Sequence, residues 1–261
     1  YKSKKYILKN ISLLYIILND DEKAKTVFEK ALKNAIVSKS ITRIVESYLG
    51  LAYIFQKQNN FVKTHYYLYK ASKIIYKSKN EKVRINLFTH YGDYSLNIGD
   101  YVKAIDFYQQ ALMLSKSTCD KYNESIIYTR ISHICQLQKK YNLSLQYNIK
   151  ALKIRKLARY DLLTGSSYTN IGSSYFLMND YKNALKYFQM GLLTAKGLER
   201  KDYVQYNYKK ICELFIKQKN YKKALDYHIL LASLNSNINR EENDRKITEI
   251  QAKYEIEKKD Q

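Results

Sequence analysis

The chain contains no proline, no tryptophan and only seven glycines in 261 residues. Proline and glycine mark the turns of β-rich folds and linkers, so their scarcity argues against both kinds of architecture. Cysteine is also rare, and the odd set of three shows no CxxC spacing, which argues against a disulfide framework or a thiolate metal site. We expect Cys135 and Cys212 to be packed thiols and Cys119 to lie near a turn.

Long apolar runs and catalytic motifs are missing as well. No run approaches the ~18 residues that cross a bilayer, and the longest, residues 11–18, is better interpreted as a helix of the folded domain. The four histidines lack metal-ligand spacing, and there is no glycine-rich phosphate loop and no GxSxG elbow. We therefore expect no enzyme, no catalytic residue, no metal and no cofactor. The chain starts with Tyr1 rather than Met and ends inside a helical pattern, so we interpret it as a fragment of a longer protein.

Acidic residues are few: 24 Asp and Glu stand against 46 Lys and Arg, which gives a formal net charge of +22. So basic a chain invites a nucleic-acid interpretation. However, Lys greatly outnumbers Arg, which favours a compositional bias spread over solvated faces. Most aromatic residues are also needed for the packing pattern described next. We therefore rank nucleic-acid binding below the alternatives.

What the chain has is a strict period, because one pattern recurs at an equal interval of about 40 residues from end to end. We define the opening residue as the residue expected to begin the second helix of each copy. A small residue lies three residues after the opening residue, and another lies nine residues before it. A large residue lies thirteen residues before it. A small side chain facing a large one lets two helices approach closely. The opening residues are Asp21, Phe61, Tyr101, Tyr141, Tyr181 and Tyr221.

This pattern resembles the tetratricopeptide repeat, which places an aromatic, a Leu-Gly pair and a Tyr on its first helix, then Ala, an aromatic and Ala on its second. The clearest copy, residues 168–193, matches at Tyr168, Ile171, Gly172, Tyr175, Ala184, Phe188 and Gly191. That family has a period of ~34 residues and a closing proline, so this chain departs from it in both respects. The extra residues most simply lengthen both helices. HEAT and armadillo repeats, with periods of ~40 to 47 residues, are the structural alternatives.

The resemblance implies an all-α fold, a right-handed α-solenoid of six antiparallel helix pairs over residues 1–234. Residues 235–239 are polar and are expected to break the helix, and residues 243–261 are expected to form a separate charged helix. Its stripe of Ile247, Ile250 and Tyr254 suits either a cap on the solenoid or a coiled coil that forms a homodimer.

Residues 246–261 also resemble the segment that follows tetratricopeptide repeats in membrane-bound signalling regulators of the Bacteroidetes. That resemblance implies a sensory region, periplasmic in location, ahead of a transmembrane helix and a histidine-kinase or DNA-binding output module. Without it, a cytoplasmic location is the expectation. Contact with a membrane is then expected only through flanking segments.

In the superhelix of this family, the first helices line the concave side. The positions twelve, eight and five residues before each opening residue face away from the packed small and large residues. The middle of the surface that they form is polar and mostly uncharged, with a few aromatics. Such groups can hydrogen-bond a peptide backbone while an aromatic ring adds apolar contact. Asp93 and His133 occupy equivalent points of adjacent first helices, which favours a surface pair over a catalytic dyad. The expected partner-binding residues are Tyr53, Gln56, Thr89, Asp93, Thr129, His133, Gln136, Thr169, Ser173, Phe176, Lys209 and Glu213.

The sequence thus favours a non-enzymatic module that binds a protein or peptide, with a constitutive scaffold or adaptor as the main alternative. The Lys/Asn set with which some members of the family clamp a C-terminal carboxylate is not reproduced at these positions. We therefore expect no tight recognition of an acidic chaperone tail.

Overall fold

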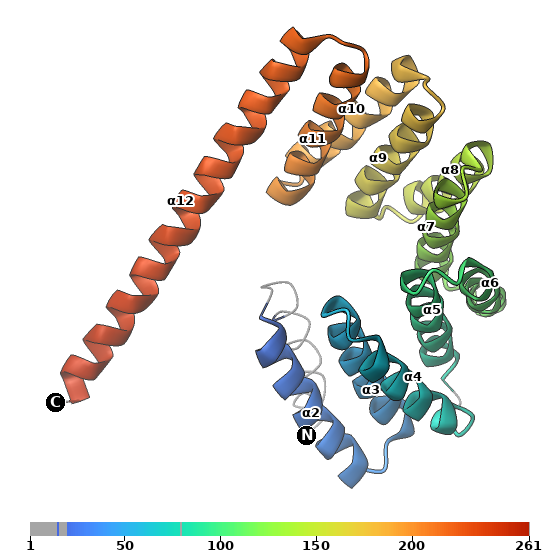
Figure 1. Ribbon diagram of the computed structural model, residues 1–261. Coiled ribbons are helices and arrows are strands. Elements are labelled where there is room, and N and C mark those ends of the chain that lie inside the picture. Colours follow the sequence, from blue (N-terminus) through green and yellow to red (C-terminus); the bar gives the residue numbers. More distant parts are fainter. Residues whose placement is uncertain (1–14, 16–19, 79, 261) are drawn as a thin grey trace. The chain divides into compact units, whose positions relative to one another are not determined.

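The computed structural model describes residues 15, 20–78 and 80–260, with side chains as far as residue 240. These residues form eleven α-helices and contain no strand (Figure 1). Among them, no helix is both long and apolar enough to cross a membrane. The expected first helix, residues 11–18, lies outside the described residues apart from Tyr15.

The chain divides into two compact units, Tyr1–Gln138 and Lys139–Gln261. Within each unit, consecutive helices run in opposite directions and pack against each other. The helices of unit 1 are α2 (Asp21–Val37), α3 (Ile41–Lys57), α4 (Phe61–Ile75), α5 (Glu81–Asn97), α6 (Tyr101–Ser117) and α7 (Lys121–Leu137). Those of unit 2 are α8 (Tyr141–Leu157), α9 (Asp161–Leu177), α10 (Tyr181–Gly197), α11 (Lys201–Lys217) and α12 (Tyr221–Asp260).

The helix boundaries explain the period. Most helices are 17 residues long and are separated by short turns of equal length. Two such helices and two such turns make up the interval from one opening residue to the next, as from Tyr101 to Tyr141. Each of the six opening residues is the first residue of its helix, from α2 at Asp21 to α12 at Tyr221. The expected opening residues therefore coincide with observed helix starts, and the division of residues 1–234 into six repeats remains a prediction.

The three-residue turns share one backbone conformation, and only the turn between α4 and α5 is longer among the described residues. The middle residue of each three-residue turn has a positive φ, as at Asn59 (56°) and Gly99 (82°). At the first of these turns, the N–H of Asn60 donates to the carbonyl of Phe55 at 2.8 Å, and the N–H of Asn59 donates to that of Gln56 at 3.0 Å. This pair of bonds closes the end of a helix as a Schellman motif. The side chains that cap the following helices by accepting a backbone N–H are Asp20, Asn60, Asn80, Asp100, Asp120, Asp180 and Asn220.

The small/large code predicted from the sequence forms the core. The ring of Tyr108 lies where a Cβ on Gly92 would stand, 2.4 Å from the nearest ring atom, and the ring of Phe188 lies 2.6 Å from such a Cβ on Gly172. Cys135 and Cys212 are buried and Cys119 is exposed in a turn, as expected. Side chains three residues after the opening residue are buried in every copy: Ala24, Thr64, Ala104, Ser144, Ala184 and Ala224.

The expected helix break at residues 235–239 is wrong. Helix α12 continues without interruption from Tyr221 to Asp260. The segment is polar but contains neither glycine nor proline, and Asn and Ser lower helix propensity only slightly. The second helix of the sixth pair and the charged C-terminal segment are therefore one helix. A separate function for residues 235–261 remains a prediction.

Candidate functional site

The first helices of unit 1 bring the expected residues onto neighbouring elements. Helix α5 packs against both α3 and α7. On α3, Tyr53 is 40% exposed, and its ring lies edge-on to the imidazole of His90 on α5, with 6.4 Å between the ring centroids. His133 on α7 is exposed, and Gln56 and Gln136 are half-buried. We call Tyr53, His90, Asp93, Arg130 and His133 the unit 1 cluster.

Asp93 is held in place by two other side chains. The hydroxyl of Tyr108 donates to its Oδ1 at 2.6 Å, and Nε of Arg130 lies 3.2 Å from the same oxygen. Burial and the Asp93 carboxylate raise the pKa of Tyr108 above its ordinary value, so its hydroxyl remains a donor. Asp93 therefore bonds to Tyr108 and Arg130 rather than to His133, and the expected surface pair of Asp93 with His133 is replaced by this three-residue chain.

His90 and Arg130 were missed by the sequence reasoning. Both lie eleven residues before an opening residue, three residues from the position of Asp93 and His133, and therefore on the same helix face. Burial lowers the pKa of His90, the Asp93 carboxylate opposes that effect and the Arg130 charge adds to it. Nδ1 of His90 is buried and has no hydrogen-bond partner among the described residues. The helical spacing from Asp93 and His133 could have found both residues.

Of the three threonines of the predicted set, two donate to carbonyls of their own helices and one donates to a neighbouring helix. Thr89 donates its hydroxyl to the carbonyl of Ile85 at 2.8 Å, and Thr129 donates to that of Ser125 at 3.2 Å. Thr169, in unit 2, is 2% exposed and donates to Oδ1 of Asn207 at 2.9 Å. Their packing role is thus visible, and their contact with a partner remains a prediction.

The other predicted side chains of the second unit differ in exposure. Phe176 is half-buried and packs against the cluster that contains Phe188. Ser173 is half-buried and donates to the carbonyl of Thr169. Lys209 is exposed, and Glu213 forms an ion pair of 2.8 Å with Lys210. In unit 2, the groups available to a partner are therefore mainly polar and charged.

Family models of the tetratricopeptide repeat match the sequence at residues 123–192 and 7–35. The chain therefore contains tetratricopeptide repeats in these two segments. The same helix-pair register continues between the matches and beyond them. No curated protein sequence matches it. The tetratricopeptide fold is typically an interaction scaffold without catalytic activity.

Solved structures with similar tetratricopeptide folds have low sequence identity to this chain. BtubC (BKLC) from P. vanneervenii has a TM-score of 0.72 at 16% identity, over 84% of this chain and 92% of that one. The STAND protein PH0952 from Pyrococcus horikoshii, with a tetratricopeptide repeat sensor, has a TM-score of 0.70 at 18% identity, over 87% of this chain and 35% of that one. A Rap protein complexed with Competence and Sporulation Factor has a TM-score of 0.67 at 13% identity, over 90% of this chain and 77% of that one. At these identities, the likeness is one of fold.

The unit 1 cluster does not line either of two hollows found among the described residues. These hollows, of about 420 Å³ and about 370 Å³, are lined by other residues, including Tyr208 in unit 2 and Tyr91 in unit 1. No group of three or more potential metal ligands occurs among the described residues. Small-molecule sites are usually enclosed and mostly apolar, whereas this face offers rings, imidazoles, a carboxylate and a guanidinium from three helices. Such an array suits a peptide or protein segment.

Proposed function

We propose that this tetratricopeptide-repeat protein is a protein- or peptide-binding module and that the unit 1 cluster is its main contact surface. The observation that carries the proposal is the convergence of Tyr53, His90, Asp93, Arg130 and His133 from α3, α5 and α7. The bond from Tyr108 orders Asp93, and Asp93 orders the Arg130 side chain. Ordered aromatic and arginine side chains are the groups that dominate binding energy at protein interfaces.

The structural comparisons support this proposal at the level of fold. One similar structure holds a Rap protein together with Competence and Sporulation Factor, and another carries a tetratricopeptide repeat described as a sensor. We propose accordingly that this chain is the sensory or interaction region of a larger bacterial signalling regulator with a histidine-kinase or DNA-binding output. A constitutive scaffold is the alternative, and the reading frame beyond residue 261 separates the two. A transmembrane span or output module there supports sensing, whereas its absence supports a scaffold.

Peptide selection tests the contact surface. A random peptide library is selected on the wild-type protein, and the recovered peptides are titrated against Tyr53→Ser/His133→Ser. The matched control is Tyr206→Ser/His228→Ser, which also changes one exposed tyrosine and one exposed histidine, both in unit 2. We expect the cluster variant to lose at least about tenfold in affinity, since truncating a central interface residue typically costs that much, and the control to bind normally.

The outcome that contradicts the proposal is equal binding by both variants, with circular dichroism showing that both are folded. Phe176 is left unchanged in this test because it packs beside the Phe188 cluster, where truncation would disturb folding.

A further inference from the structure

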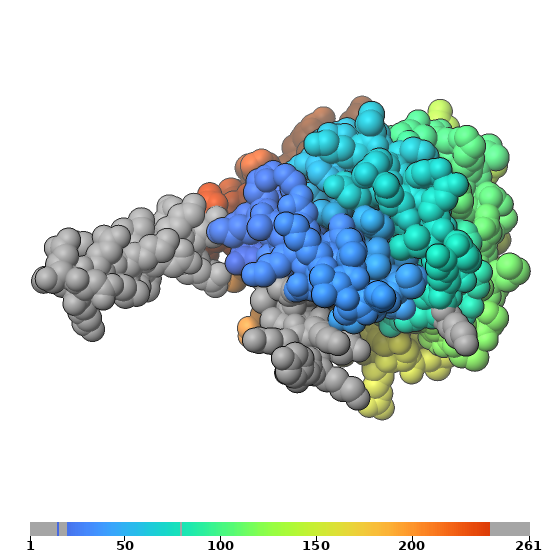
Figure 2. Space-filling model, turned by 90° about the horizontal axis from the view of Figure 1, so that it is seen from below, coloured from blue at the N-terminus to red at the C-terminus, as the bar shows by residue number. Residues whose placement is uncertain are grey.

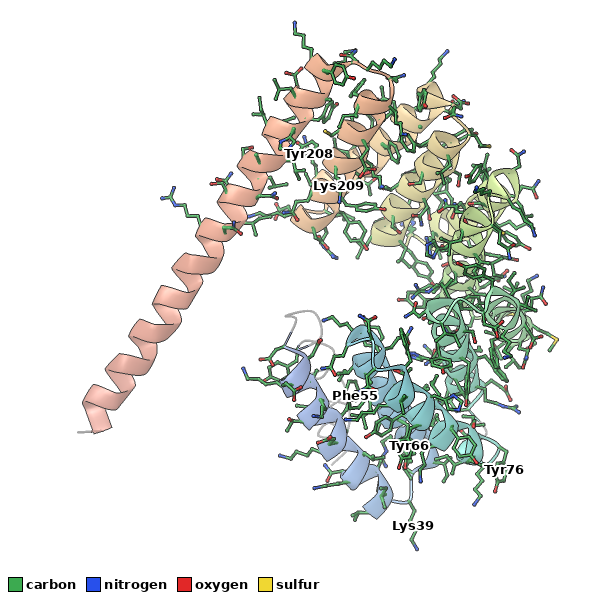
Figure 3. The ribbon with its side chains drawn as sticks, viewed as in Figure 1. Lys39, Phe55, Tyr66, Tyr76, Tyr208 and Lys209 are labelled. Atoms are coloured by element: carbon green, nitrogen blue, oxygen red, sulfur yellow. The ribbon has the colours of Figure 1, made fainter. Side chains whose placement is uncertain are left out.

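The outer face of α4 exposes a row of tyrosine rings. Tyr66, Tyr69 and Tyr76 are 50%, 46% and 70% exposed, and Tyr76 is the residue that ends the helix. Figure 3 shows Tyr66 along α4 and Tyr76 at its end. With Lys73 they occupy positions i, i+3, i+7 and i+10, which is one helix face. The blue-to-cyan surface over α2, α3 and α4 is continuous in the space-filling view (Figure 2).

Three lysines accompany these rings. They are Lys70 and Lys73 on α4 and Lys77 just beyond it, whereas the ammonium of Lys63 lies over the ring of Phe55 on α3. The ammonium of Lys70 lies 5.4 Å from the ring centroid of Tyr66, that of Lys73 lies 5.0 Å from Tyr69, and that of Lys77 lies 5.5 Å from Tyr76. Helix α4 contains no Asp or Glu. The result is a local positive charge held beside exposed π-surfaces.

Other second helices lack this combination. Helices α8 and α10 also carry lysines and no acidic residue. Their exposed large side chains are aliphatic, such as Ile149 and Leu193. Charge alone therefore does not distinguish α4 from them; the exposed tyrosines do. Most aromatics were expected to be used in packing, and these three rings are exceptions. That packing role was one of the two reasons for ranking nucleic acid low, the other being the excess of Lys over Arg.

We infer that the α4 face binds single-stranded nucleic acid, with Tyr66, Tyr69 and Tyr76 stacking on bases and the lysines contacting phosphates. Stacking on aromatic side chains beside a basic track is how proteins hold single strands without sequence preference. The absence of Arg from α4 argues against a fork-like contact with one phosphorylated side chain. A membrane surface is disfavoured because the exposed rings carry hydroxyls and the stripe has no exposed Trp, Phe or Leu. This surface is separate from the unit 1 cluster and adds a second activity.

The charge test uses fluorescence anisotropy with a labelled oligothymidylate over a range of salt concentrations. Lys70→Gln/Lys73→Gln/Lys77→Gln is compared with Lys150→Gln/Lys153→Gln/Lys156→Gln on α8, which removes the same charge from exposed positions. We expect only the α4 variant to lose about tenfold or more in affinity. Its slope of log affinity against log salt should fall in magnitude by about 2, that is ~0.7 for each lost phosphate contact. Equal losses in both variants would show diffuse attraction to a basic protein and overturn the inference.

The ring test separates stacking from charge. Tyr66→Gln/Tyr69→Gln keeps every charge and uses a good helix former. We expect a loss on the order of tenfold or more with an unchanged salt slope, because a stacked base contributes through its ring. Unchanged affinity overturns the inference. So does tighter binding of the wild type to phosphatidylserine vesicles than to the oligonucleotide, if the same variants abolish it. Circular dichroism of every variant confirms folding.

Discussion

At the scale of single residues, the repeat depends on glycines that make room for rings. A Cβ on Gly172 would stand 2.6 Å from Phe188, 2.8 Å from a second atom of that ring and 3.1 Å from the carbonyl oxygen of Ala184. The ring is fully buried and the carbonyl belongs to a helix, so neither can move aside cheaply.

Gly172→Ala is therefore expected to destabilise the protein by about 1–3 kcal/mol, the usual cost of overpacking a core. The matched control is Gly197→Ala, since a Cβ there meets nothing within 4 Å. The measurement is the urea midpoint of each variant by circular dichroism. If both substitutions shift the midpoint equally, the close approach of α9 and α10 is not as described.

His90 supplies a pH dependence at the same scale. Its folded-state pKa lies below the ordinary imidazole value, mainly because of burial. The unfolded chain therefore takes up a proton at His90 before the folded protein does, and stability falls as the pH drops below ~6.5. Above that pH His90 is neutral in both the folded and the unfolded protein, so it no longer makes the stability depend on pH.

We expect His90→Phe, which keeps a ring beside Tyr53 but cannot titrate, to be less destabilised than the wild type between pH 7.5 and about pH 5.5. Urea midpoints at the two pH values measure this. An identical loss in both proteins would mean that other groups account for the acid sensitivity.

At the scale of elements, the turns hold the register. The middle residue of each described three-residue turn has a positive φ, and several of these residues, such as Lys219 (58°), are neither Gly nor Asn. A left-handed conformation costs an ordinary residue roughly 1–2 kcal/mol.

Two opposite changes test this. Gly99→Ala should destabilise by about 1 kcal/mol through the backbone alone, because a Cβ there has open space. Lys219→Asn should stabilise by up to about 1 kcal/mol, since Asn visits this conformation more readily. Urea midpoints decide, and a stabilising Gly99→Ala would contradict the turn geometry.

Helix α12 leaves an apolar face uncovered. Tyr221, Leu225 and Ile229 are 65%, 59% and 56% exposed. On α10, the preceding second helix, Tyr181 and Leu185 occupy the positions of Tyr221 and Leu225 and are half-buried. The homodimer was predicted through residues 243–261, whose side chains lie outside the described residues. We propose that the exposed face of Tyr221, Leu225 and Ile229 on the same helix takes part in it. Leu225→Ser/Ile229→Ser should weaken self-association in sedimentation velocity without lowering helix content. A wild-type protein that stays monomeric at high concentration would contradict it.

The success of the sequence reasoning also varies by element. Helix starts were predictable because a strict period and a small/large code fix the register at every copy. The continuity of α12 was not, because polarity at residues 235–239 was mistaken for a helix stop. In the unit 1 cluster, Tyr53, Asp93 and His133 followed from their equivalent positions. The hydrogen bond from Tyr108 to Asp93 joins a second helix, α6, to a first helix, α5. It could not be predicted from the spacing along the first helices alone.

At the scale of the molecule, we propose that the first helices present a binding face and that the second helices support it. Tyr108 on α6 illustrates the support, since it is fully buried and orders Asp93 on α5. Tyr108→Phe should therefore weaken binding of a selected peptide. Its urea midpoint should change little, because the ring that fills the space beside Gly92 is kept.

Hydroxyl-radical footprinting of the protein with and without a selected peptide tests the central claim most directly. The account predicts that the peptide protects Tyr53 and His133 from oxidation and leaves Tyr66 and Tyr76 on the α4 face unchanged. Protection confined to α4 or α12, with Tyr53 and His133 still oxidised at the free rate, would contradict it.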